Sequence, residues 1–207
     1  MPTKWCCTSN ANLSNKLKTK WNSFKDFLLL DSAIPFHIPH QDQAPELLTR
    51  ASAMNAGWMW QIPLVNRIGA GYVFSSQHIN EEQAIDEIQQ YLGFKIEPHK
   101  TLKFEPGHFE QVWQKNVMAL GLASGFVEPL EATSIGQMLE QLRMFTNVLV
   151  NSGLVVSDLS IQQFNQANAA SWQVYVISYV CIMIVSEQIP HFGNKSVKRH
   201  ILKVIRH

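Results

Sequence analysis

An α+β fold is predicted by three features of this sequence: one stretch of strands and two stretches with helical spacing. Residues 47–76 read as a β-meander, in which a turn at 55–57 precedes one extended strand over 58–64 and another over 72–75. Apolar residues then recur at helical intervals after residue 80 and again over 135–149. Because the strands come before the helices and do not alternate with them, the order indicates the α+β class.

The first helix has clear start and stop signals. Asn80 can cap its N-terminus, with Gln83 three residues later as in a capping box, and Gly93 can end it. A short strand is expected over residues 102–104. The apolar stripe of the helix consists of Ala84, Ile85, Ile88, Tyr91 and Leu92.

The second helix is expected after Pro129, which breaks the chain, and Thr133 or Ser134 can cap it. Residues 151–153 close it, and a further helix is expected from about Asp158. Such spacing is typical of an amphipathic helix. The apolar side chains that repeat along the second helix are Ile135, Met138, Leu139, Leu142, Phe145, Val148 and Leu149.

The composition is that of a globular chain without the charge of a nucleic-acid binder. The 207 residues are 46% hydrophobic and 16% charged, and the net charge is +1. The N-terminus lacks the apolar core of a signal peptide, so a cytoplasmic location is expected. The apolar run Val174 to Val185 has 12 residues, whereas a membrane helix needs about 20, so no membrane contact is expected.

No metal site is predicted. Cys6 and Cys7 are adjacent and Cys181 is distant, so the chain has no Cys-x-x-Cys pair for zinc or redox chemistry. His37 and His40 flank an Ile-Pro step, which favours an extended turn over a helical pair of ligands.

Residues 57–63 read Gly-Trp-Met-Trp-Gln-Ile-Pro. On a strand the side chains alternate between faces, so Trp58, Trp60 and Ile62 share one face and form a wide apolar wall. Pro63 lacks a backbone donor and limits the strand or places it at an edge. Taken alone, two large aromatic side chains more often fill a core than build a site.

A second motif lies in residues 116–135, which read Asn-Val-Met-Ala-Leu-Gly-Leu-Ala-Ser-Gly-Phe-Val-Glu-Pro-Leu-Glu-Ala-Thr-Ser-Ile. Together with the earlier Trp-x-Trp-x-Ile-Pro, it resembles the flavin-dependent halogenases of the tryptophan-halogenase family. The resemblance covers most of residues 17–173, and residues 1–16 are a poorly matched lead segment. The Gly-x-Gly-x-x-Gly cradle for FAD phosphates, which precedes the tryptophan motif in that family, is absent from this sequence. The chain therefore resembles the C-terminal part of a halogenase, and we expect it to be inactive alone.

The resemblance implies a reaction, cofactors and partners. In the family, halide is converted to hypohalous acid at reduced FAD, and the acid halogenates an electron-rich aromatic substrate such as tryptophan or indole. A separate flavin reductase supplies reduced FAD, and the full-length form is compatible with a homodimer. The implied fold is the end of a flavin-monooxygenase-like sheet followed by a mainly helical C-terminal region. Trp58, Trp60, Ile62 and Pro63 would separate substrate from flavin.

The same resemblance assigns roles at the start of the second helix. Glu131 matches the active-site glutamate of the family, and a carboxylate there can accept a proton during the reaction. Thr133 and Ser134 match the positions whose backbone amides hold halide, and a helix N-terminus suits an anion. Ala132 stands beside the flavin where many members carry a serine, and Ser134 stands where many carry glycine. Because of these two departures, the geometry of halide binding and the communication between the flavin site and the substrate site stay open questions.

Three alternatives remain at this point. The chain could belong to an aromatic-ring flavin monooxygenase, it could be a non-catalytic gene remnant or interaction module, or it could be anchored to a membrane by residues 174–185. Halide dependence of the complete protein would separate the first alternative from a halogenase. Failure to bind flavin, together with an exposed core, would favour the second.

The tail, residues 174–207, departs from the family abruptly after Trp172. The family continues with Gly-Ile-Arg-Asp-Phe, then His-Tyr, then Lys-Arg-x-Asp-x-Pro-Phe-Trp. When the possible codons for residues 173–196 are read one base earlier, they allow Gly at 173/174, Asp and Phe over 176–178, and Leu-His-Tyr-Asp over 180–183. Since this order reproduces the family pattern, we predict that the tail is an out-of-frame translation. It is expected to pack poorly and to differ in order from the helix before it.

Overall fold

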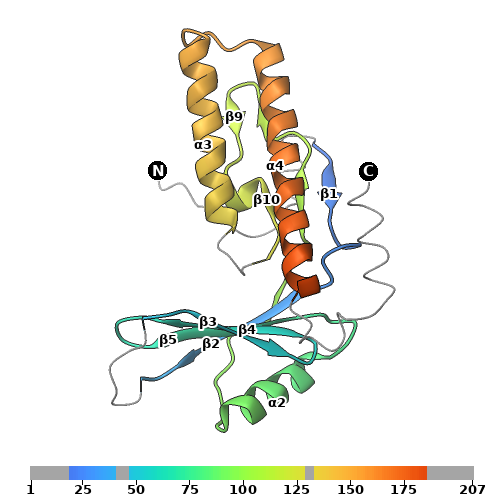
Figure 1. Cartoon of the computed structure of the whole chain (residues 1–207), viewed down its shortest axis with the longest axis vertical. Helices are drawn as coiled ribbons and strands as arrows, with labels where there is room; N and C mark the ends of the chain where they lie inside the picture. Colours follow the sequence, from blue (N-terminus) through green and yellow to red (C-terminus); the bar gives the residue numbers. More distant parts are fainter. Residues whose placement is uncertain (1–18, 41–46, 129–132, 186–207) are drawn as a thin grey trace. The chain divides into compact units, whose positions relative to one another are not determined.

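The structure of the chain, a computed structural model, describes residues 19–40, 47–128 and 133–185. The chain divides into two compact units. One consists of residues 1–28 and 106–178, and the other of residues 29–105 and 179–207. We call them the helical unit and the sheet unit and describe each by itself. Both helices and strands are present, as the α+β prediction requires (Figure 1).

The sheet unit contains a five-stranded sheet in the order β3-β4-β5-β2-β6 with antiparallel neighbours. The meander predicted over residues 47–76 is confirmed as three successive strands. The long strand β2 was missed by the sequence analysis because a proline, Pro35, lies at its centre. β6 pairs with β2 only at Ser32 and Ala33, so Pro35 lies where that side of β2 has no ladder partner. The strands are β2 Ser32–Ile38, β3 Arg50–Met54, β4 Gly57–Pro63, β5 Ile68–Phe74 and β6 Leu102–Lys103.

Helix α2, Glu81–Leu92, packs on one face of this sheet (Figure 1). The predicted capping box is confirmed, because the side chain of Asn80 accepts from the backbone of Gln83 and the Gln83 side chain accepts from the backbone of Asn80. Gly93 ends the helix in the left-handed conformation, with φ of 76°. The buried residues of this core are Ile34, Phe36, Ile38, Met54, Met59, Ala70, Tyr72, Phe74, Ala84 and Ile88.

Tyr72 ties the helix to the turn between β3 and β4. Its buried hydroxyl donates to Glu87 Oε2 at 2.9 Å and accepts from the backbone N–H of Ala56 at 3.2 Å. The other Glu87 oxygen accepts from the backbone N–H of Asn55 at 2.6 Å. Burial, and next the bond to the carboxylate, raise the pKa of Tyr72, so the phenol stays protonated and keeps donating.

The helical unit combines small sheets with two long helices. β7 lies between β1 and β10 in a three-stranded antiparallel sheet, and β8 pairs with β9. The sequence analysis missed these strands, which are only two or three residues long. The elements are β1 Trp21–Ser23, β7 Gly107–Phe109, β8 Trp113–Gln114, β9 Val117–Met118, the 3-10 turn η1 Gly121–Ala123, β10 Gly125–Phe126, α3 Thr133–Asn151 and α4 Asp158–Val185. The last residues of α4, from 179 on, belong to the sheet unit.

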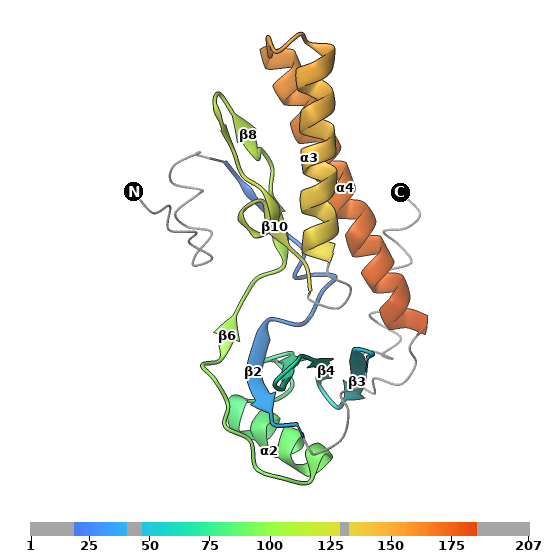
Figure 2. The ribbon, with the colours of Figure 1, turned by 90° about the vertical axis from the view of Figure 1, so that its left-hand side faces the viewer.

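The predicted bounds of the two helices are confirmed at their shared connection, where α3 ends at Asn151 and α4 begins at Asp158. The two helices lie side by side (Figures 1 and 2). The C-terminal half of α3 packs as the sequence predicts, since Phe145 and Val148 join a cluster around Trp113 and Phe164.

The N-terminal half of α3 is the reverse of the expected pattern. Its buried side chains are the polar Thr133, Gln137 and Gln141. Ile135 and Leu139, by contrast, are each 59% exposed. The expectation that the apolar repeat marks the inward face is therefore wrong for this half, because buried hydrogen-bonding partners favour the polar face there.

Helix α4 continues past Gln173 without interruption to Val185. Val176, Tyr179 and Val180 are buried, at the i, i+3 and i+4 spacing of one helix face. The expectation that the chain packs poorly directly after Gln173 is therefore wrong for these residues, although residues 186–207 lie outside the described ones. In the described parts of the chain, no helix is long and apolar enough to cross a membrane.

Candidate functional site

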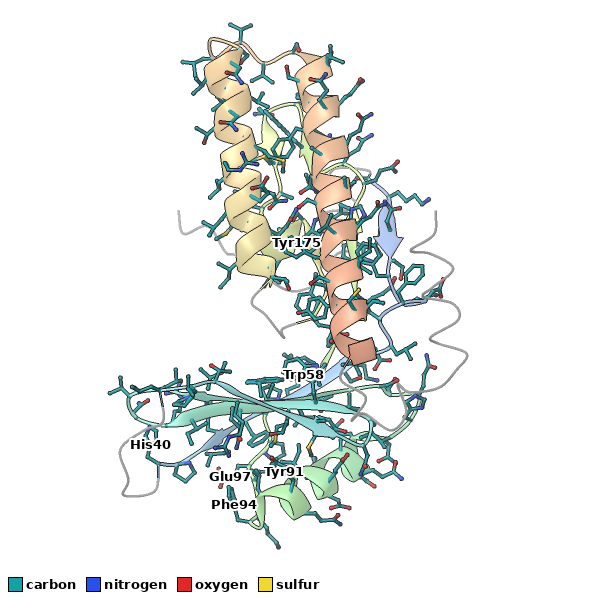
Figure 3. All side chains as sticks on the ribbon, in the orientation of Figure 1. His40, Trp58, Tyr91, Phe94, Glu97 and Tyr175 are labelled. Carbon is teal, nitrogen blue, oxygen red and sulfur yellow. The ribbon has the colours of Figure 1, made fainter. Side chains whose placement is uncertain are left out.

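The aromatic wall lies on β4. Trp58 is 4% exposed and Trp60 is partly buried, and their ring centroids are 6.0 Å apart with 58° between the ring planes. Met59, between them, is fully buried on the other face, in the core that α2 covers. Figure 3 shows Trp58 on the side of the sheet away from α2. Alternation along the strand thus places both indoles on one face of the sheet.

A glycine on the neighbouring strand receives the Trp60 ring. Gly71 of β5 pairs with Trp60 in the sheet register. A Cβ added at Gly71 would collide with several ring atoms of Trp60, Cε2 among them at 2.8 Å. Ala51 of β3 lies opposite Trp60 on the other side. The indole therefore lies over a backbone without a side chain, which no larger residue at position 71 would allow.

The wall becomes more open toward the end of β4. Ile62 is 41% exposed and Pro63, the last residue of the strand, is partly buried. Gly69 lies opposite Ile62, and a Cβ there would make only ordinary contacts, with Leu64 Cδ1 at 3.6 Å and with the Ile62 carbonyl oxygen at 3.9 Å. Of the two glycines in this stretch, only Gly71 is thus required by a close approach.

The second motif leads into α3. β10 is followed by the buried Val127 and Glu128, and α3 begins at Thr133. The Thr133 hydroxyl is buried and donates to the backbone carbonyl of Glu128 at 3.4 Å. Ser134 follows in the first turn of the helix and is partly buried.

Two predicted site residues, Glu131 and Ala132, lie outside the described residues. Trp58, Trp60, Ile62 and Pro63 belong to the sheet unit, whereas Thr133 and Ser134 belong to the helical unit. The structure therefore brings the members of each group together without relating one group to the other.

Each group has a distinct chemical capacity. The indole pair consists of two large apolar rings, tilted against each other, of a kind that packs well against another aromatic ring. The dipole of the 19-residue helix α3 favours an anion at its start, where backbone N–H groups point along the helix axis.

The described residues contain neither a glycine-rich phosphate-binding loop nor a cluster of metal ligands. Gly69 and Gly71 lie inside strand β5 and do not open a helix, so they form no phosphate cradle. No group of three or more His, Cys, Asp or Glu side chains in that part of the chain could hold a metal ion.

One buried histidine lies outside both groups. His108 of β7 is 2% exposed, its Nδ1 lies 3.0 Å from the Phe109 carbonyl oxygen, and its ring packs against Phe24. Burial lowers the pKa of His108, which favours the neutral imidazole. Its place in the small sheet indicates a packing role.

The sequence indicates a close backbone approach at Gly69 and Gly71, and the structure has one at Gly71 alone of these two. Sequence reasoning missed Gln137, Gln141 and Asn168, whose buried amides join α3 to α4.

Comparison with known proteins gives a consistent result. The model of the family described as "Tryptophan halogenase" matches residues 6–182. An uncharacterized protein of Sinorhizobium fredii, y4xG, is 41% identical over 164 residues, which are 79% of this chain and 32% of that protein. The tryptophan 6-halogenase SttH of Streptomyces toxytricini is 38% identical over 127 residues, which are 59% of this chain and 24% of that enzyme. The chain thus spans about a quarter to a third of the length of these relatives.

Solved structures match over more of the chain. BrvH, a flavin-dependent halogenase from Brevundimonas sp. BAL3, has a TM-score of 0.78 at 27% identity, covering 90% of this chain and 40% of that one. The crystal structure of SttH has a TM-score of 0.75 at 27% identity, covering 92% of this chain and 40% of that one.

Proposed function

This chain belongs to the tryptophan halogenase family, and from that we propose that its residues 17–173 form part of an FAD-dependent halogenase acting on an electron-rich aromatic such as tryptophan or indole. The reaction assigned to the whole enzyme is halogenation of the ring by hypohalous acid made at reduced flavin. The observation that carries the proposal is the Trp58–Trp60 pair on one face of β4, inside a chain that matches the family.

We assign to the wall the separation of substrate from flavin. Two indoles 6.0 Å apart, one of them lying over Gly71, form a surface with little rotational freedom. Such a surface can hold an aromatic substrate on one side and exclude water. Ile62 and Pro63 extend it toward the open end of the strand.

We assign halide binding to the first turn of α3. The backbone N–H groups of Thr133 and Ser134 are donors of the kind that bind anions at helix starts. The buried bond from the Thr133 hydroxyl to the Glu128 carbonyl stabilises that turn. Ala132 would lie next to the flavin, and Glu131 would accept a proton from the substrate ring or position hypohalous acid.

The residues of this chain do not fit the phosphates of FAD, since no Gly-x-Gly-x-x-Gly occurs among its 207 residues. The proposal therefore derives no step through the flavin. It requires that reduced FAD, supplied by a separate flavin reductase, is bound by other parts of the whole enzyme.

The proposal is tested in a chimera, in which residues 19–173 of this chain replace the structurally matching segment of the S. toxytricini enzyme. We expect halogenated tryptophan, identified by mass spectrometry, whose amount depends on added chloride or bromide. A hydroxylated product formed without halide would support an aromatic-ring monooxygenase, and a folded chimera with neither product would favour a non-catalytic module.

The 207-residue chain alone is expected neither to retain FAD nor to halogenate indoles or phenols, because it lacks the phosphate cradle. The measurement is the flavin absorbance of the purified chain, together with product analysis after incubation with reduced FAD and halide. Stoichiometric FAD or any chlorinated product would contradict this expectation.

We further propose that residues 174–207 are translated out of frame. The codon pattern supports this, and an apolar run can continue a helix whatever its origin. Resequencing the locus is expected to reveal a one-base insertion or deletion near codon 173. Its correction would restore the reading frame that encodes Gly-Ile-Arg-Asp-Phe. A single intact frame for residues 174–207, with the same tail in orthologues, would contradict it.

A further inference from the structure

The inward face of the first half of α3 carries amides where a core usually carries apolar side chains. Gln137, Gln141 and Asn168 of α4 are all fully buried. We call these three residues the amide cluster. Burying a primary amide is unfavourable unless it is hydrogen-bonded, so the bonds of the cluster indicate what it does.

Asn168 joins the two glutamines. Its Oδ1 accepts from Gln137 Nε2 at 2.9 Å and from Gln141 Nε2 at 2.8 Å. Ser171, on the next turn of α4, donates to Gln137 Oε1 at 2.6 Å. With its oxygen turned to both glutamines, Asn168 has a buried amide nitrogen without a hydrogen-bond partner in the described residues. A buried donor without a partner is unfavourable for stability.

Gln141 extends the cluster to the segment before α3. Its Oε1 accepts from the backbone N–H of Gly121 at 3.0 Å, and its Nε2 also donates to Ser124 Oγ at 2.9 Å. Ser124 in turn donates to the Gly121 carbonyl at 2.7 Å. Gly121 adopts φ of 56°, in the left-handed region that glycine tolerates.

The cluster therefore fixes the chain on both sides of residues 129–132. Before them, the turn at 121–124 is bound to Gln141. After them, Gln137 lies one helical turn beyond Thr133 and is bound to α4. Replacing such buried polar partners together by apolar groups of similar shape is often nearly neutral for stability. The amides then contribute to the geometry of the backbone that they bind, rather than to stability.

We propose that the amide cluster is a positioning device for the proposed reaction, and that Gln141 and Asn168 fix the position of the halide-binding turn of α3. This rests on the proposed function, since the turn has its role from it. The amides act through the backbone they hold and do not touch substrate.

The first experiment uses the 207-residue chain. In the double variant Gln141→Met/Asn168→Leu, amide hydrogen exchange over residues 121–128 and 134–137 is expected to accelerate at least about tenfold, because the bonds that close this region are lost. Exchange in β4 and β5 should not change. Unchanged exchange at 121–137 in the folded variant would overturn the proposal.

Asn165→Leu is the matched control. This buried asparagine lies on the same helix, and its side chain bonds the backbone of Val112 and Trp113. Its loss should accelerate exchange at 112–113 and leave 121–137 unchanged. If Asn165→Leu instead accelerates exchange at 121–137 equally, the cluster has no specific role.

The second experiment uses the chimera, assayed below its unfolding temperature. The double variant is expected to raise the KM for halide at least about fivefold, with lower kcat, whereas Asn165→Leu should leave the halide KM unchanged. A merely structural role would reduce the amount of active enzyme without moving that KM, and this result would overturn the proposal. An unsubstituted chimera without activity would count against the proposed function, while the exchange experiment would still decide the positioning role.

Discussion

Glu131→Gln in the chimera is expected to lower the turnover of tryptophan halogenation by about 10²-fold or more, the scale typical of a positioned acid–base group. Glutamine has nearly the same shape as glutamate but cannot accept the proton that the ring must lose. The amount of folded protein and its melting temperature should stay close to those of the parent. Product formation is measured at saturating halide by chromatography.

Glu140→Gln is the control for this substitution. Glu140 makes an ion pair with Arg143 on the exposed side of α3, and exposed pairs contribute little to stability. The same chemical change there should leave turnover within about twofold. Full turnover in a folded Glu131→Gln variant would remove Glu131 from the site.

Gly71→Ala is expected to destabilise the sheet unit by about 1–3 kcal/mol, the usual range for overpacking a well-packed region. The new methyl group would occupy the place of the Trp60 ring, so the indole must leave the face of β5. The measurement is urea unfolding of the 207-residue chain by circular dichroism, with the near-ultraviolet signal reporting on the tryptophans.

Gly69→Ala provides a matched comparison two residues away on the same face. A Cβ there makes only ordinary contacts, with Leu64 and with the Ile62 carbonyl, so the change in unfolding free energy should be within about 0.5 kcal/mol. Equal stability of the two variants, with an unchanged tryptophan signal, would show that Trp60 does not depend on Gly71.

The elements that sequence reasoning found are those with local signals. The capping box at Asn80 and Gln83 and the stop at Gly93 involve neighbours in sequence, and α2 was predicted between them. β2 was missed because its partners come much later in the chain and Pro35 resembles a turn signal. Its register with β5, from Ser32 with Phe74 to Ile38 with Ile68, is not a local property.

The candidate site divides in the same way. Alternation along one strand was enough to place Trp58 and Trp60 on a common face. The role of Gly71 depends on cross-strand pairing, which one strand's sequence does not contain. Gln137 and Gln141 escaped notice because polar residues at helical spacing look like a solvent-facing side. Glu131 was indicated by family resemblance alone and lies outside the described residues.

The contact between the Trp60 ring and the backbone of Gly71 limits which substitutions the aromatic wall can accept, in evolution or in the laboratory. The size of residue 71 determines how closely the ring at position 60 can approach the backbone of β5. Substitutions at the two positions are therefore coupled. A mutant library that varies residues 58 and 60 but keeps Gly71 yields smaller side chains and leaves empty space over the backbone at Gly71. A library that also varies position 71 can change the distance between the ring at position 60 and the sheet in steps of one methyl group. The space left for a substrate changes with that distance.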